Sequence, residues 1–258
     1  NNKNNKKKFH VDYIFTQNKC AAKLYNSFTS GKTVCIGSFA NNIKKRKIKR
    51  KKREVLYIST YKPHNDYVPK INEKKNITNK PGESFYKYDE LVIKTLNELS
   101  NKNNLNFTVL GRNTGENLKN EKKYFNNVIK SKYNFITRSK NKTSNDIMDE
   151  FEYVFTDFST LGVENLSKGG KTGFIFAKPD IYSWHTVRIG GLENFNSQGP
   201  FWTTVKKNNK KEFTRVFNFV VKSNTNTWKK AGRKYTAQLM EYDPGNKMFL
   251  KIIKKVIN

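Results

Sequence analysis

Short apolar runs alternate with longer amphipathic segments along most of the chain. Runs rich in β-branched and aromatic residues predict strands at 54–60, 105–111, 134–137, 153–155 and 174–176. Apolar residues at helical spacing predict helices between them, at 84–100, 116–131, 143–151 and around 161–166. Strands that alternate with helices of this length indicate an α/β protein with a Rossmann-like, mostly parallel sheet. Such sheets bind ligands at the carboxyl ends of their strands.

The two ends of the chain depart from this pattern. A strand–helix–strand piece is predicted at 11–15, 19–28 and 33–36, and it is too small to form a domain by itself. A nearly continuous basic block at 41–53 follows and is typical of a linker or exposed loop. After residue 180 the pattern weakens into a Gly-rich aromatic segment, and helices are predicted at 210–222 and 225–242. We therefore divide the chain into 1–53 and 54–258.

Polar residues follow four of the predicted strands. They are Ser59 and Thr60, then Gly111 and Arg112, then Arg138 and Ser139, and finally Asp157, Ser159, Thr160 and Gly162. The last group lies between a strand and a helix, where backbone N–H groups bind anions. Arginine can hold phosphate oxygens in pairs, and Glu164, one turn into the helix, could accept hydrogen bonds from a ribose diol. Together these residues predict a nucleotide site.

Each of these residues also has a purely structural interpretation. Ser159 or Thr160 would cap a helix, Glu164 would favour the helix dipole, and Arg112 and Arg138 would be solvated surface charges. Their shared placement at successive strand ends favours the nucleotide site over these separate explanations.

Several other kinds of site are absent from the sequence. It contains neither the G-x-G-x-x-G nor the P-loop fingerprint, and no D-x-D pair or His/Cys cluster, so we expect no metal and no cofactor. His185 shares the segment SWHTVR with Arg188 and is a candidate phosphate or acceptor contact, whereas His64 fits a donor-site ligand, a base or a solvated loop residue equally well.

The chain is strongly basic, with 51 Lys and Arg, 21 Asp and Glu, and a formal net charge of +30. This charge predicts attraction to polyanions, although a general drift toward Asn and Lys would also produce it. No apolar run approaches the ~18 residues that a membrane span needs, and the first residues lack a signal-peptide core. Cys20 and Cys35 fit a reduced compartment. We expect a cytoplasmic protein that is soluble or peripheral to the membrane.

Three segments resemble a known family. FTDFSTLGVENLSKGGKTGFI is similar to the S-[ST]-x-G-x-E-x-L-x-x-G-x-[KR] segment of bacterial surface-polysaccharide and O-antigen biosynthesis proteins, a glycosyltransferase group with the two-Rossmann GT-B fold. GPFWTT with EFTRVFNFV and TWKKAGRKY resembles the tail of that group, and DYIFTQNKCAAKLY with VCIGSF resembles the end of its first domain. The resemblance runs from about residue 11 to about 245.

The resemblance implies that 54–258 is the nucleotide-sugar-binding half of a GT-B enzyme and that 1–53 holds a remnant of the first domain. Ser159, Thr160 and Gly162 would contact phosphates, Glu164 the ribose, and Arg138 the departing diphosphate, without a metal. The helix at 225–242 would pack toward the first domain. Because most of that domain is missing, no catalytic base is named. Asn165 stands where the family more often has a small residue.

The resemblance implies sugar transfer from a nucleotide-sugar to a glycan or lipid-linked acceptor at the inner face of the membrane, where Lys44 to Arg53 could approach anionic lipids. A transferase of polyol phosphate would need the same phosphate site, so it stays open as an alternative. A nucleic-acid-binding protein is disfavoured, because the densest basic block contains no aromatic residue.

Overall fold

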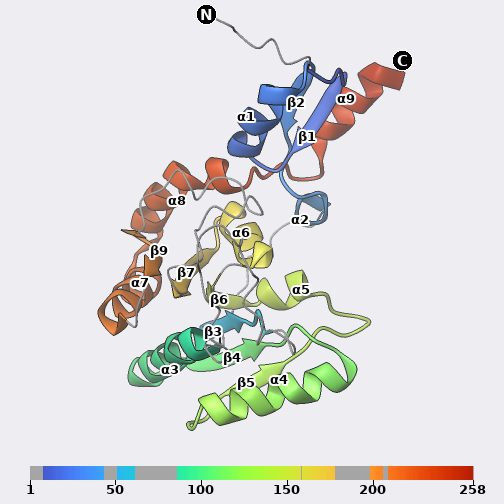
Figure 1. The fold of residues 1–258 in the computed structure, drawn as a ribbon. Coiled ribbons are helices and arrows are strands. Elements are labelled where there is room, and N and C mark those ends of the chain that lie inside the picture. The colour runs from blue at the N-terminus through green and yellow to red at the C-terminus, as the bar shows by residue number, and fades with distance from the viewer. Residues whose placement is uncertain are drawn as a thin grey trace, which may run out of the picture.

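The computed structural model describes residues 8–43, 51–61, 86–157, 159–177, 198–205 and 209–257. Two parts can be distinguished in Figure 1. The first, here called the sheet domain, runs from β3 to α8. The second, here called the small unit, combines the beginning of the chain with its last helix.

Seven strands form the main sheet of the sheet domain. They are β3 (Lys51–Ile58), β4 (Asn106–Leu110), β5 (Asn134–Ile136), β6 (Phe151–Thr156), β7 (Lys171–Ala177), β8 (Gln198–Gly199) and β9 (Trp202–Val205). The order across the sheet is β5-β4-β3-β6-β7-β9-β8. Every neighbouring pair is parallel except the antiparallel pair of β8 and β9. The predicted α/β class with a mostly parallel sheet is confirmed.

The strand order reverses direction between β3 and β6. The chain moves outward from β3 through β4 to β5, then returns to the other side of β3 and continues through β6, β7 and β9. Counted along the chain, the six parallel strands have the order 3-2-1-4-5-6 that is typical of dinucleotide-binding folds. Ligands of such sheets bind in the crevice beyond the carboxyl ends of the two strands that flank the reversal. Those strands are β3 and β6.

Helices cover both faces of the sheet. They are α3 (Tyr86–Lys102), α4 (Gly115–Val128), α5 (Ser144–Met148), α6 (Thr160–Ser167), α7 (Lys210–Lys222) and α8 (Thr225–Leu239). Alternate residues of β3 enter different hydrophobic clusters: Val55 and Tyr57 one, Leu56 and Ile58 the other. Because successive side chains of a strand point to opposite faces, this division means that both faces are buried.

The small unit contains a two-stranded parallel sheet between two helices. Its elements are β1 (Tyr13–Thr16), α1 (Lys19–Phe28), β2 (Lys32–Cys35) and α9 (Lys247–Ile257), of which the sequence did not predict α9. Phe249 of α9 makes edge contacts with Phe15, at 4.9 Å between ring centroids, and with Phe39, at 4.7 Å. The last helix of the chain therefore packs on its first strands, as Figure 1 shows in red and blue.

The chain crosses between the two parts twice, and the two segments are bonded to each other. Residues 36–43, which include α2 (Phe39–Ile43), lead out of the small unit, and residues 240–246 lead back; we call this pair the crossover. Asn42 is 1% exposed and links the segments, since its Nδ2 donates to Asn246 Oδ1 at 2.9 Å and its Oδ1 accepts from Asp243 N at 3.0 Å. α8 also contacts α1, as the resemblance implied.

Exposed apolar surface is distributed unevenly. Within the described residues, all large hydrophobic side chains classed as exposed lie in the small unit or the crossover: Phe9, Val11, Leu24, Tyr25, Phe28, Phe39, Ile43, Met248, Leu250, Val256 and Ile257. Among the described residues of the sheet domain, the large hydrophobic side chains are buried or partly buried. None of the helices in the described part of the chain is both long enough and apolar enough to cross a bilayer.

Candidate nucleotide-binding site

The ends of β3 and β6 are joined at the strand reversal. Thr60 Oγ1 donates a hydrogen bond of 2.9 Å to Asp157 Oδ2. Asp157 is only 6% exposed, and Ser59 beside it is 3% exposed. Three of the predicted polar residues therefore lie together at the strand reversal, the position at which sheets of this order generally bind ligands.

Tyr57 lies in β3, three residues before Thr60, and its hydroxyl has a shifted pKa. Burial raises the pKa of the Tyr57 hydroxyl well above the ordinary value of 10.0, and the negative charges of Asp89 and Asp157 raise it further. The phenol therefore stays neutral over the physiological range.

The start of α6 forms the polar elbow after β6. Ser159 is the N-cap residue of α6, and its hydroxyl accepts a hydrogen bond of 3.3 Å from Leu161 N. Ser159 N donates to Thr156 Oγ1 at 3.2 Å, which ties the elbow to the end of the strand. Thr160 is exposed at the first position of the helix. The structural interpretation of Ser159 as a helix cap is confirmed, and the same geometry directs the helix N-terminus to the carboxyl edge.

Gly162 brings α6 close to the sheet. A Cβ atom at this position would lie 2.7 Å from Thr156 Cγ2 and 3.3 Å from a ring carbon of Phe174. The amide of Gly162 donates to Ser159 O at 3.0 Å. Its observed contribution is thus close packing of helix on strand, which is the role of one glycine in dinucleotide-binding folds.

A buried carboxylate that the sequence analysis missed organises the loop after β4. Glu121 of α4 is 0% exposed and accepts hydrogen bonds from Arg112 N at 3.0 Å and Asn113 N at 2.9 Å. It also accepts from the hydroxyl of Ser59. The Arg112 side chain is exposed, and Gly111 is needed because a Cβ there would lie 2.6 Å from the Phe135 ring. Glu121 therefore fixes the ends of β3 and β4 relative to each other.

The remaining predicted site residues are less closely placed. Arg138 and Ser139 follow β5, which is an edge strand of the sheet, and both residues are exposed. Ser139 N donates to Lys142 O at 3.0 Å in a tight loop. His64, His185 and Arg188 lie outside the described residues, as does most of the basic block, whose last residues Lys51 to Arg53 begin β3.

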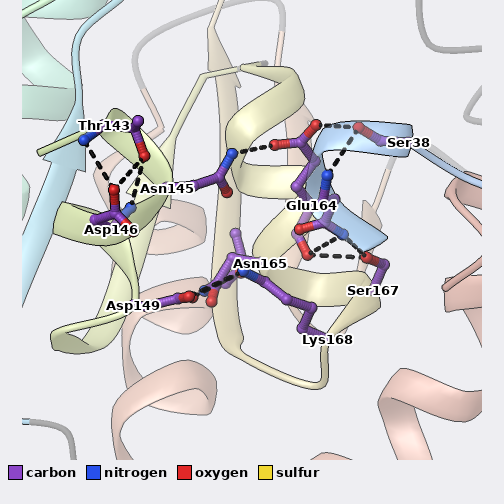
Figure 2. Close-up of polar contacts among 11 residues, drawn as sticks. Ser38, Thr143, Asn145, Asp146, Asp149, Glu164, Asn165, Ser167 and Lys168 are labelled. Carbon is purple, nitrogen blue, oxygen red and sulfur yellow. Dashed lines mark hydrogen bonds and ion pairs between the residues drawn. The ribbon is translucent and has the colours of Figure 1, made fainter. Parts of the chain in front are cut away.

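Glu164 is held by two donors from distant parts of the chain (Figure 2). Ser38 Oγ, from the crossover, donates to Glu164 Oε1 at 2.7 Å, and Asn145 Nδ2, from α5, donates to Glu164 Oε2 at 3.0 Å. Asn41 Nδ2 donates to the backbone oxygen of Glu164 at 3.3 Å and to Ser167 Oγ at 2.9 Å. The crossover thus rests directly on α6.

Two further contacts fix α6. Lys168 Nζ lies 2.9 Å from Asp149 Oδ1, and their side chains are 0% and 4% exposed, so this ion pair locks α5 to α6. Asn165 is completely buried and donates from Nδ2 to Thr172 Oγ1 at 2.9 Å. Its size is accommodated by Gly170, where a Cβ would lie 2.0 Å from Asn165 Oδ1.

Sequence reasoning found the strand ends but missed Glu121, Ser38 and Asn145. Glu121 shares a helix face with the buried residues Phe125 and Val128 of α4, and this spacing could have identified it. Ser38 and Asn145 gave no comparable local signal, because their partner lies 126 and 19 residues away in the sequence. The described part of the chain holds no group of His, Cys, Asp and Glu residues suited to a metal ion.

Solved structures share this fold at low sequence identity. The S. aureus MnaA structure with UDP matches with a TM-score of 0.54 and 13% identity, over 96% of this chain and 60% of that one. The H548A variant of the wall teichoic acid polymerase TagF matches with a TM-score of 0.50 and 14% identity, over 95% and 58%. The GtfA/B complex gives 0.50 and 13%, over 95% and 46%. The chain thus spans about half to three fifths of these proteins.

No curated protein matches the sequence. The family described as "putative O-antigen biosynthesis protein" matches residues 1–257, which is nearly the whole chain. The chain belongs to this family of O-antigen biosynthesis proteins.

Proposed function

We propose that the protein is a glycosyltransferase that moves a sugar from a nucleotide-sugar donor to a glycan or lipid-linked acceptor during O-antigen biosynthesis. The observation that carries this proposal is the junction of Thr60 and Asp157 at the strand reversal, beside the N-terminus of α6, in a chain of the O-antigen family. UDP in the MnaA structure supports a nucleotide ligand for a fold of this kind.

In this proposal the phosphates of the donor meet the start of α6. Ser159 and Thr160, with the positive end of the helix dipole, would stabilise the negative diphosphate, and the packing of Gly162 lets the helix approach the strand ends. The carboxylate of Glu164 would accept hydrogen bonds from the hydroxyls of the ribose. The exposed Arg138 and Arg112 would balance charge on the leaving group, so that no metal or cofactor is required.

The acceptor and the catalytic base would involve parts of the protein that the described residues do not supply. His185 and Arg188 are proposed to contact the acceptor or the phosphates. The reaction is proposed to take place at the inner face of the membrane, where the block from Lys44 to Arg53 would approach anionic headgroups.

A transferase of polyol phosphate is the second candidate. The structural similarity to the wall teichoic acid polymerase TagF, at a TM-score of 0.50, supports this second candidate activity. Both activities need the same diphosphate contacts at α6. They differ in the group attached to the diphosphate, so trials of nucleotide-sugars against nucleotide-activated polyol phosphates separate them.

The first experiment is a thermal-shift panel of UDP, GDP, CDP, CMP and ADP with a short single-stranded oligonucleotide, at low and moderate salt. A ligand that binds only the folded state raises the melting temperature. Stabilisation by one nucleotide that survives moderate salt is expected. If only the oligonucleotide stabilises the protein and salt abolishes the effect, the proposal is wrong.

Arg138 offers a sharper test of the phosphate contacts. Arg138→Ala should weaken binding of the nucleoside diphosphate more than binding of the nucleoside, because in this proposal the guanidinium balances the charge of the phosphates. Arg233→Ala, which removes an exposed arginine from α8, is the matched control. Equal losses for both ligands in calorimetry would remove Arg138 from the proposed site.

A further inference from the structure

The crossover holds Ser38 in a defined position. The preceding residue, Gly37, has φ of +74°, and a Cβ there would lie 2.0 Å from Glu241 O, so the two segments of the crossover touch at this glycine. Asn42, four residues beyond Ser38, is buried and bonded to the returning segment. Ser38 is therefore fixed from both sides by backbone that cannot shift independently.

The opposite donor is equally well fixed. Asn145 lies in the first turn of α5, whose N-terminus is closed by a reciprocal capping box between Thr143 and Asp146. The ion pair of Asp149 with Lys168 then ties the end of α5 to α6, the helix that carries Glu164. Figure 2 shows Ser38 and Asn145 approaching the carboxylate from opposite sides.

These contacts determine how the carboxylate of Glu164 can act. Each oxygen accepts one hydrogen bond from the protein, at 2.7 Å from Ser38 and 3.0 Å from Asn145. An ionised carboxylate offers about four acceptor positions, so roughly one on each oxygen remains. Two adjacent acceptors at fixed orientation match two adjacent hydroxyl donors. A carboxylate on a long, unrestrained side chain would lose rotamer freedom on binding such a ligand.

We propose that Ser38 and Asn145 are positioning residues that orient Glu164 to bind a cis-diol, and that the crossover thereby belongs to the donor site. The inference rests on the proposed function, in which Glu164 accepts hydrogen bonds from the ribose, and deepens it by naming the two residues that orient the carboxylate. The contribution of Ser38 gives the crossover, which joins the small unit to the sheet domain, a part in donor recognition.

The test compares calorimetric affinities for UDP and 2′-deoxy-UDP, or for the pair that corresponds to the nucleotide found in the thermal-shift panel. The wild-type protein should prefer the ribonucleotide. Ser38→Ala should reduce this preference by about fivefold to tenfold. Without the hydroxyl of Ser38 the carboxylate of Glu164 is no longer held in one orientation, and its hydrogen bonds to the diol, which are strong when aligned, become weaker. Ser38→Thr, which keeps the hydroxyl, should restore it. Asn145→Ala should act like Ser38→Ala, while Ser27→Ala, an exposed serine of α1, should change nothing.

The outcomes separate the two levels of the proposal. If the wild-type protein binds none of the nucleotides, the proposed function fails and takes this inference with it. If it binds ribonucleotide and deoxyribonucleotide equally, the assignment of Glu164 to a diol is wrong. If it discriminates between them and Ser38→Ala and Asn145→Ala discriminate just as well, the proposed function stands and the positioning role alone is overturned.

Discussion

Thr60 and Asp157 are separated by 97 residues in the sequence, yet the hydroxyl of one donates to the carboxylate of the other at 2.9 Å. The bond joins the two strands between which the sheet reverses its order. Hydrogen bonds to a buried charge are stronger than those between neutral groups. The contact therefore holds the two sides of the candidate crevice together.

Removing this bond should weaken the fold. Thr60→Val keeps the shape of the side chain but takes one donor from the buried carboxylate of Asp157, so we expect the free energy of unfolding in urea to fall by about 1–3 kcal/mol. Thr60→Ser, which keeps the hydroxyl, is the control and should lose much less. Equal stabilities for Thr60→Val and Thr60→Ser would contradict the assigned role of the bond.

The close packing of α6 predicts opposite effects for two glycines. Gly162→Ala places a Cβ 2.7 Å from Thr156 Cγ2 and should destabilise the protein by about 1–3 kcal/mol through overpacking. Gly232→Ala, in α8, meets nothing nearer than Thr236 Oγ1 at 3.8 Å and should add about 0.5–1 kcal/mol, the helical advantage of alanine. Thermal unfolding of the two variants tests these opposite changes in stability. A Gly162→Ala variant as stable as the wild type would show that α6 can move away from the sheet.

The ion pair between α5 and α6 is buried, so losing one partner should cost more than losing both. Asp149→Ala leaves the ammonium of Lys168 in a place where its side chain is 0% exposed, and a loss of about 3–5 kcal/mol is expected. The double variant Asp149→Leu with Lys168→Met should recover a large part of it. A double variant less stable than Asp149→Ala, measured by urea unfolding, would rule out desolvation as the dominant cost.

Stability should decline at alkaline pH. Burial raises the pKa of Tyr57 well above its ordinary value of 10.0, so above pH 10 the unfolded chain loses this proton while the folded chain keeps it. The folded state then binds more protons, and the free energy of unfolding falls as pH rises, by at most about 1.4 kcal/mol per pH unit for one group. Tyr57→Phe should make the decline shallower.

The alkaline experiment has a built-in comparison. Burial also raises the pKa of Tyr153, so part of the decline should persist in Tyr57→Phe. Burial lowers the pKa of Lys171 below 10.5, which makes stability rise with pH up to that value and then adds nothing more. If wild type and Tyr57→Phe lose stability in parallel between pH 10 and 12, Tyr57 titrates like an exposed tyrosine and the prediction is wrong.

Local pattern was sufficient to predict most of the sheet domain. α7 in the sheet domain has the predicted bounds, and so does α1 in the small unit. α7 buries an apolar stripe of Phe213, Val216, Phe217 and Val220, and the strands are short apolar runs, so both patterns are visible without knowing what the elements pack against. The position of the strand ends at one edge of the sheet followed from the same alternation, which is why Thr60, Asp157 and Ser159 could be named in advance.

The parts that could not be predicted depend on distant contacts. α9 leaves large apolar residues such as Leu250 and Ile257 exposed and begins just after Gly245, so its pattern alone does not separate it from a tail. β9 pairs with β7 although the two strands are far apart in the sequence, and it lies in the Gly-rich aromatic segment where the alternating pattern weakens. The two donors to Glu164 come from the crossover and from α5, and only the assembled fold brings them together.

The contrast between the buried sheet domain and the apolar surface of the small unit has a practical consequence for the behaviour of the protein in solution. A formal charge of +30 keeps the molecules apart at low ionic strength. At about 0.15 M salt this repulsion is screened beyond roughly 8 Å, whereas attraction between exposed apolar side chains is not. Colloidal stability should therefore decrease as salt is added, and low-salt buffers suit the protein best.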